Sequence, residues 1–170
     1  AEIAHALIGG GIAGMEELQR SLQEPAFEDS VKLLAEADSI WLMATRRSFA
    51  VSTYLAYALQ HTDKRIHHIT SSGSMQEGQL RGMRPEDVLI AVSFAPYAEE
   101  TESIVRHAHE RGACIIAITD SRLSPLARFA TCSLLVQETS VFGFRALTTS
   151  MAVAQSLFMA LAYRLELDYQ

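Results

Sequence analysis

The sequence predicts an α/β fold in which a doubly wound sheet of about five parallel strands carries helices on both faces, behind a helical arm. Short apolar runs alternate with helical patterns from Ser39 to Val136. These runs are apolar at nearly every position, as strands buried on both faces must be. The chain has 170 residues, 49% of them hydrophobic, which is enough for one well-buried core. We therefore expect a single three-layer globular domain.

The first 37 residues predict the helical arm. Leucines and isoleucines recur at mixed spacings of three and four, and Leu18 and Leu22 share one face. Gly9–Gly11, Gly14 and Pro25 interrupt this pattern. Because glycine and proline disfavour helix interiors, we expect short helices with a break between them. Residues 1–37 are assigned to the arm and residues 38–170 to the globular domain.

The globular part follows in alternating segments. The predicted strands are Ile40–Ala44, Ile66–Ile69, Val88–Val92, Cys114–Thr119 and Leu134–Val136. The predicted helices between them are Phe49–Leu59, Met75–Leu80 and Glu99–Glu110. Gly112 ends the last of these, because glycine tolerates the left-handed closing conformation. The segment Phe144–Leu165 is apolar around most of a helix, so we expect it to be buried on more than one side, in the domain and at a subunit interface.

Composition and charge exclude several classes of function. The net charge is -6 and the lysines and arginines are scattered, so the chain should not hold nucleic acid by itself. No run approaches the length of a membrane span and no signal peptide is present, so we expect a cytoplasmic domain that contacts no membrane. Cys114 and Cys132 lack the paired spacing of a zinc site and are predicted to be buried and reduced.

The histidines form neither a metal pair nor a catalytic arrangement. His67 and His68 are adjacent in a predicted strand and so face opposite sides of the sheet. His107 and His109 are two apart on a helix and point in different directions. We predict no catalytic residue, no metal and no cofactor.

Ser48 and Ser93 are the strongest candidates for a binding site. Each comes just after an apolar run and before a helical pattern. Ligands of parallel α/β sheets bind at the carboxyl ends of the strands, where hydroxyls and helix N-termini converge on anions. Arg46 and Arg47 add positive charge to the first loop. The structural alternatives are that Ser48 caps the following helix and that both arginines are solvated.

Further polar groups are weaker candidates. Ser72 belongs to the cluster Ser71–Ser74 after the second predicted strand, and this cluster either closes over the same ligand or forms a polar turn. Ser140 and Arg145 precede the last helix and border the ligand in this interpretation.

With these loops placed, the chain resembles the sugar isomerase (SIS) domain, and more closely the version in RpiR-type bacterial transcriptional regulators. The resemblance covers roughly residues 39–165, and it rests on the segments Ile40–Ala50, Leu89–Thr101 and Gly112–Ala127. It implies a flavodoxin- or Rossmann-like sheet and a phosphosugar ligand. In such domains the first loop usually reads Gly-x-Gly-x-Ser, and its serine and that of the second loop bind the phosphate. These roles carry over onto Ser48 and Ser93.

The sequence departs from the family pattern at several positions. Ala44 and Arg46 replace the two glycines, and Ala95 and Ala98 stand where SIS enzymes often have hydroxyls. Arg46 either compensates for lost amide contacts with its charge or fills the pocket.

The resemblance also implies partners. RpiR-type regulators carry a helix-turn-helix domain ahead of this one, and the domain forms dimers or tetramers. We therefore expect the effector-binding half of a longer protein, a homodimer or homotetramer that contacts DNA only through such an upstream domain. Its function is then to sense a phosphosugar without catalysis. The alternatives are a phosphosugar aldose–ketose isomerase and a purely structural dimerisation domain with a decayed pocket.

Overall fold

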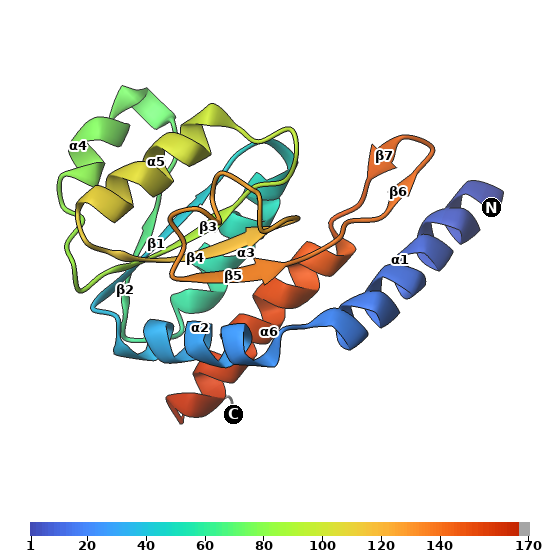
Figure 1. Cartoon of the computed structure of the whole chain (residues 1–170), viewed down its shortest axis with the longest axis horizontal. Coiled ribbons are helices and arrows are strands. Elements are labelled where there is room, and N and C mark those ends of the chain that lie inside the picture. Colours follow the sequence, from blue (N-terminus) through green and yellow to red (C-terminus); the bar gives the residue numbers. More distant parts are fainter. Residues whose placement is uncertain (167–170) are drawn as a thin grey trace.

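The computed structural model describes residues 1–166 and confirms the α/β fold (Figure 1). Five parallel strands form one sheet in the order β2-β1-β3-β4-β5. Their bounds are Ser39–Ala44 (β1), Arg65–His68 (β2), Val88–Val92 (β3), Cys114–Thr119 (β4) and Cys132–Leu135 (β5). The longer helices are Glu2–Ser21 (α1), Glu24–Glu36 (α2), Phe49–Leu59 (α3), Glu99–Glu110 (α5) and Thr148–Arg164 (α6). Shorter elements are η1 (Arg46–Ser48), η2 (Ser72–Ser74) and α4 (Gln76–Leu80).

The sheet separates two hydrophobic cores because successive strand residues point to opposite faces. In β1, Ile40 and Leu42 join the core that contains α2, α3 and α6, whereas Trp41 and Met43 join the core that contains α5. All six residues of β1 and all five of β3 are buried. The near-continuous apolar runs of the sequence are therefore central strands covered on both faces.

The arm differs from its prediction. Helix α1 runs without a break through all four glycines, and the interruption falls instead at Leu22 and Gln23. Pro25 lies in the first turn of α2, where its missing N–H is tolerated. Gly10, Gly11 and Gly14 are accommodated because they face the globular part, and a Cβ added at Gly14 would lie 2.9 Å from the Thr139 side chain, whereas Gly9 faces open space. Close packing thus replaces the intrinsic helix propensity that glycine lacks.

The segment before the last helix is a hairpin rather than helix. Ser140–Val141 (β6) pairs antiparallel with Phe144–Arg145 (β7), and α6 begins only at Thr148. Phe142 and Gly143 both have positive φ, of 51° and 75°, as the tightest hairpin turns require. Helix α6 contacts α1, α2 and α3 and is buried on several sides, as predicted.

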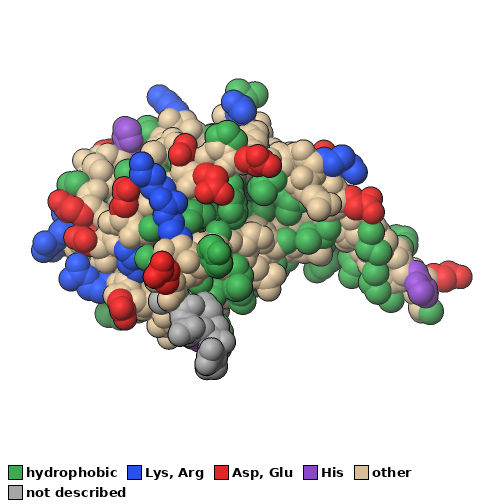
Figure 2. Space-filling view, turned by 90° about the horizontal axis from the view of Figure 1, so that it is seen from below, with side chains coloured by type: hydrophobic (Ala, Val, Ile, Leu, Met, Phe, Trp, Pro, Cys, Tyr) green, Lys and Arg blue, Asp and Glu red, His purple; other side chains and the backbone are tan. Residues whose placement is uncertain are grey.

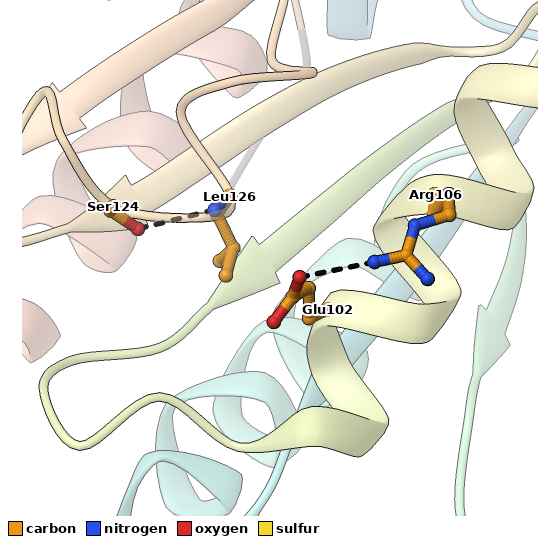
Figure 3. A network of polar contacts seen from close by, with 4 residues as sticks. All are labelled: Glu102, Arg106, Ser124 and Leu126. Carbon is orange, nitrogen blue, oxygen red and sulfur yellow. Dashed lines mark hydrogen bonds and ion pairs between the residues drawn. The ribbon is translucent and has the colours of Figure 1, made fainter.

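Helix α5 ends as predicted. Gly112 has φ of 78°, the left-handed conformation that glycine adopts without strain. On the exposed side of α5, Arg106 donates to Glu102 over 3.1 Å, one helical turn apart (Figure 3). In the loop after β4, the Ser124 hydroxyl accepts a hydrogen bond from the Leu126 amide over 3.2 Å (Figure 3). Both contacts are local, and the first lies on the surface whereas Ser124 and Leu126 are buried.

The burial of Cys132 and the opposite orientations of His67 and His68 are as predicted, whereas Cys114 is only half-buried. Cys114 is half-buried and Cys132 buried, and neither forms a disulfide. His67 stacks on Trp41 and His68 on Phe49, on opposite sides of β2. Within residues 1–166 no three His, Cys, Asp or Glu side chains are grouped as metal ligands would be. No helix in that range is long and apolar enough to cross a membrane.

Candidate functional site

The two candidate loops meet at one edge of the sheet. Strands β1 and β3 are parallel neighbours, with Ala44 opposite Val92. Ser93 follows Val92 directly and Ser48 ends the short turn η1, so both serines lie at the carboxyl edge of the same strand pair. Each is only 5% exposed. Sequence reasoning therefore placed the loops correctly, while the ligand-binding role of the two serines remains a prediction.

The Ser93 loop is held in one conformation by Asp120. The Asp120 carboxylate accepts hydrogen bonds from the Ala95 amide over 3.0 Å and from the Tyr97 hydroxyl over 2.5 Å. Burial, together with these interactions with Asp120, raises the pKa of Tyr97. The Ser93 hydroxyl itself accepts from the Ala98 amide over 3.4 Å, immediately before α5. The loop is thereby fixed while the hydroxyl proton of Ser93 stays available to an acceptor.

The loop that contains Ser48 has an unusual backbone conformation at Arg46. Ser48 occupies the N-cap position of α3, yet its side chain makes no capping hydrogen bond there, so capping does not account for it. Arg46 has φ of 54°, in the left-handed region that favours glycine. Where the resembled family pattern has a glycine, this chain thus has an arginine in a backbone conformation that favours glycine.

A cavity of about 640 Å³ opens beside these loops. Among the predicted site residues it is lined by Arg46, while Ser48 and Ser93 are buried next to lining residues of their own loops. Its polar lining comes from four segments around β1, β2 and β3: Thr45, Arg46, Thr70, Ser71, Gln76, Tyr97, Glu99 and Glu100. A polar cavity of this size at the strand ends matches the dimensions of a small-molecule site.

Arg47 turns away from solvent toward Phe94. Its guanidinium carbon lies 5.6 Å from the centre of the Phe94 ring. Its Nε and Nη2 atoms are buried and have no hydrogen-bond partner among residues 1–166. Burial lowers the pKa of Arg47, and the positive charge of Arg145 lowers it further. Buried donors without acceptors are rare in native structures, so a group that accepts from Arg47 would be strongly favoured.

Glu138 is a half-buried acid near the serine loops that sequence reasoning did not identify. Its Oε1 atom accepts from the Ser150 amide over 2.8 Å, at the start of α6, whereas Oε2 is buried and unpartnered within the described range. Burial raises the pKa of Glu138, opposed by hydrogen bonds from Ser150 and Thr149 and by the charge of Arg47. The available signal was its position just after the fifth strand, at the same edge as the serines. Arg47 and Glu138 together offer free donors and a free acceptor.

The remaining predicted residues are distributed differently. Arg145 donates from Nη1 to the Ala95 carbonyl, which brings it onto the Ser93 loop beside Arg47. Ser140, its partner in the hairpin, is exposed and does not line the cavity. Ser72 is exposed in η2 and borders a separate cavity with Thr70 and Met75. The structure therefore groups Arg46, Arg47 and Arg145 around the serine loops and leaves Ser72 and Ser140 outside.

The chain is similar in sequence and in structure to known proteins. The SIS domain family matches residues 33–164. The sugar isomerase domain of an RpiR transcription factor from Sphaerobacter thermophilus is 28% identical, with a TM-score of 0.87 over 93% of this chain and 88% of that one. The comparison with curated protein sequences found no match.

Two more distant structures share the fold. The Vibrio vulnificus NanR protein, complexed with ManNAc-6P, is 17% identical with a TM-score of 0.84 over 96% of this chain and 63% of that one. Phosphoheptose isomerase from Neisseria gonorrhoeae is 17% identical with a TM-score of 0.79 over 95% of this chain and 98% of that one. Regulators and isomerases thus both have this fold. The match over residues 33–164 covers most of the chain, which belongs to the SIS domain family.

Proposed function

We propose that this chain is the effector-binding and oligomerisation domain of a transcriptional regulator of sugar metabolism, and that it binds a phosphosugar without converting it. DNA is contacted by an N-terminal domain outside this chain, and the domain acts as a homodimer or homotetramer. Similarity to an RpiR transcription factor at 28% identity supports the regulatory role. The NanR protein complexed with ManNAc-6P supports the class of ligand.

The observation that carries the proposal is the free polar surface at the carboxyl edge of β1 and β3. In our assignment the phosphate is bound by Ser48 and Ser93 near the N-terminal ends of α3 and α5, with Arg46 facing it from the cavity wall. The Arg47 guanidinium and Glu138 Oε2 have unused hydrogen-bonding capacity in the described structure. A sugar hydroxyl that reaches the Arg47 guanidinium can accept from it, and one that reaches Glu138 Oε2 can donate to it.

Calorimetric titration with N-acetylmannosamine 6-phosphate, arabinose 5-phosphate and glucose 6-phosphate tests the proposal. A hydrogen bond to a charged group contributes about 1.5–3 kcal/mol, so Ser48→Ala and Ser93→Ala should each weaken binding by about 10- to 100-fold. Ser133→Ala is the matched control, because Ser133 lies inside β5 opposite Ala117, away from the strand ends. Failure of all three sugars to bind the folded protein would rule out this function.

A second function, aldose–ketose isomerisation of a phosphosugar, is favoured by one observation. Such a reaction needs a base that removes a proton from the carbon beside the carbonyl and returns it to the neighbouring carbon. The raised pKa of Glu138 and its free Oε2 suit that role. Sugar interconversion that is abolished by Glu138→Gln, with binding retained, would establish the isomerase and exclude the non-catalytic sensor. Binding without turnover supports the sensor.

A further inference from the structure

The polar groups beside the serine loops lie apart from the exposed apolar surface of the molecule. Figure 2 shows hydrophobic side chains gathered along the projecting arm, where Ile3, Ile8 and Ile12 are more than half exposed. No residue of this arm lines the cavity beside the serine loops. The acid Asp120 instead bonds to two residues of the Ser93 loop, one of which lines that cavity.

Both oxygens of the Asp120 carboxylate are used by the Ser93 loop. Oδ2 accepts from the Ala95 amide over 3.0 Å, and Oδ1 accepts from the Tyr97 hydroxyl over 2.5 Å. Hydrogen bonds to an ionised acceptor are roughly twice as strong as bonds between neutral groups. Between Ser93 and Glu99, only Tyr97 has a side chain that can donate a hydrogen bond, the other residues being Phe94, Ala95, Pro96 and Ala98. The loop therefore depends on Asp120 for its side-chain anchor.

Asp120 is itself fixed to the sheet. It follows Thr119, the last residue of β4, whose hydroxyl donates to Ser124 over 2.8 Å. The backbone carbonyl of Asp120 accepts from Gln137 Nε2 over 2.7 Å, just after β5. Because β4 and the segment after β5 both hold Asp120, its carboxylate is a fixed point from which the Ser93 loop takes its position.

The charge of Asp120 opposes the binding of an anion at this edge of the sheet. Burial and the charge of Arg145 lower the pKa of Arg47, and the negative charges of Glu138 and Asp120 partly offset this, so Asp120 acts on the guanidinium beside the proposed ligand. A carboxylate repels phosphate, so on charge alone the removal of Asp120 would strengthen phosphate binding. The effect of Asp120 through its charge and its effect through the loop that it holds therefore have opposite signs.

We propose that Asp120 is a positioning residue of the sugar-phosphate site, which holds the Ser93 loop so that the Ser93 hydroxyl and the N-terminal end of α5 face the phosphate. This role rests on the proposed function, because it presupposes that Ser93 binds phosphate. Tyr97 completes the arrangement: its only hydroxyl proton is donated to Asp120, while the residue lines the cavity. Tyr97 thus shapes the cavity and does not donate to the ligand.

Calorimetric titration of wild type, Asp120→Asn and Tyr97→Phe with N-acetylmannosamine 6-phosphate, arabinose 5-phosphate and glucose 6-phosphate tests this role. An asparagine side chain keeps one acceptor oxygen, so one of the two loop donors loses its acceptor. Asp120→Asn should weaken phosphosugar binding by about tenfold although it removes a negative charge, and Tyr97→Phe, which changes no charge, should weaken it by a similar factor. An Asp120→Asn variant that binds as tightly as wild type, or more tightly, overturns the positioning role.

Asp87→Asn is the matched control. Asp87 is buried directly before β3, at the amino edge of the sheet, and its carboxylate also accepts two hydrogen bonds, from Trp41 Nε1 over 3.0 Å and from the Arg84 amide over 2.9 Å. The same substitution there should lower Tm, as Asp120→Asn does, and leave the phosphosugar affinity unchanged. Equal weakening of binding in the two variants would show that Asp120 acts only through stability, which contradicts the proposal.

Amide hydrogen exchange of the ligand-free chain separates this role from the proposed function. Residues 94–98 should exchange about tenfold faster in Asp120→Asn and in Tyr97→Phe than in Asp87→Asn. Equal exchange in the three variants refutes the restraint on the loop, whatever the sugars do. Faster exchange together with no sugar binding by any form, wild type included, refutes the proposed function and leaves Asp120 a structural restraint without a role in binding.

Discussion

Because Arg46 has a left-handed backbone, we expect its replacement by glycine to relieve strain in the folded protein and to weaken phosphate binding. Residues other than glycine lose about 1–2 kcal/mol in this conformation because Cβ approaches the following carbonyl, and Arg46 has φ of 54°. Replacing Arg46 by glycine removes that strain. Glycine also loses more backbone entropy on folding, roughly 0.5–1 kcal/mol relative to alanine. The net expectation is that Arg46→Gly is more stable than Arg46→Ala by about 0.5–1 kcal/mol.

The pair Arg46→Gly and Arg46→Ala isolates the backbone effect because both lack the guanidinium. For a domain of this size, 1 kcal/mol corresponds to about 2–4 °C in Tm, so the glycine variant should melt about 1–4 °C above the alanine variant. Urea unfolding followed by circular dichroism gives the free-energy difference directly. Both variants should bind phosphate more weakly than wild type, since Arg46 lines the cavity. An alanine variant as stable as the glycine variant would refute the argument from strain.

Three further predictions concern stability. Burial raises the pKa of Glu138 above its unfolded value, so the folded state binds the proton more tightly than the unfolded state does. The stability of the wild type therefore falls as the pH rises from about 4.5 through the folded pKa. Glu138→Gln should reduce this fall, so its Tm relative to wild type should be more favourable at pH 7 than at pH 4.5. Gly9→Ala should stabilise the protein by up to about 1 kcal/mol, because alanine has the higher helix propensity and no atom lies within 4 Å of the added Cβ. Gly14→Ala should lose this gain, because its Cβ would contact the Thr139 side chain. Equal urea midpoints for the two variants would contradict the packing argument. Trp41→Phe removes the hydrogen bond that Nε1 donates to Asp87 over 3.0 Å, and unfolding titrations should show a loss of about 1.5–3 kcal/mol, an unchanged free energy being the contrary result.

The sheet and its flanking helices were predictable because their signals are local. Each central strand is a short apolar run, and α3 spans Phe49–Leu59 both in the prediction and in the structure. The register that sets Ala44 opposite Val92 follows once the runs are taken as adjacent parallel strands. The two serine loops were then placed correctly at one edge, because parallel strands share the direction of their carboxyl ends.

The errors occurred where tertiary contacts overrule local preference. Gly10 and Gly14 indicated a break in the arm, yet they permit close packing on Val141 and Thr139, and α1 is continuous. The hairpin β6–β7 was hidden because Phe142, with φ of 51°, is an unusual residue for a left-handed turn position. Glu138 gave little signal, since an acid after a strand is common. Its partners are Ser150 at the α6 N-terminus, 12 residues on, and the charge of Arg47, which is far away in sequence.

Arg46 shows how the pocket differs from the family pattern that the sequence suggested. The family pattern that the sequence resembles has a glycine at this position, and here Arg46 holds a left-handed backbone that glycine adopts without strain while it adds a long cationic side chain. That side chain is exposed and lines the cavity instead of being packed into the core. A guanidinium recognises phosphate through charge-assisted bidentate hydrogen bonds, which add geometric specificity as well as energy. In the proposed function, Arg46 therefore offers directed, charged donors to a phosphate from the cavity wall, which favours anion binding over loss of the site.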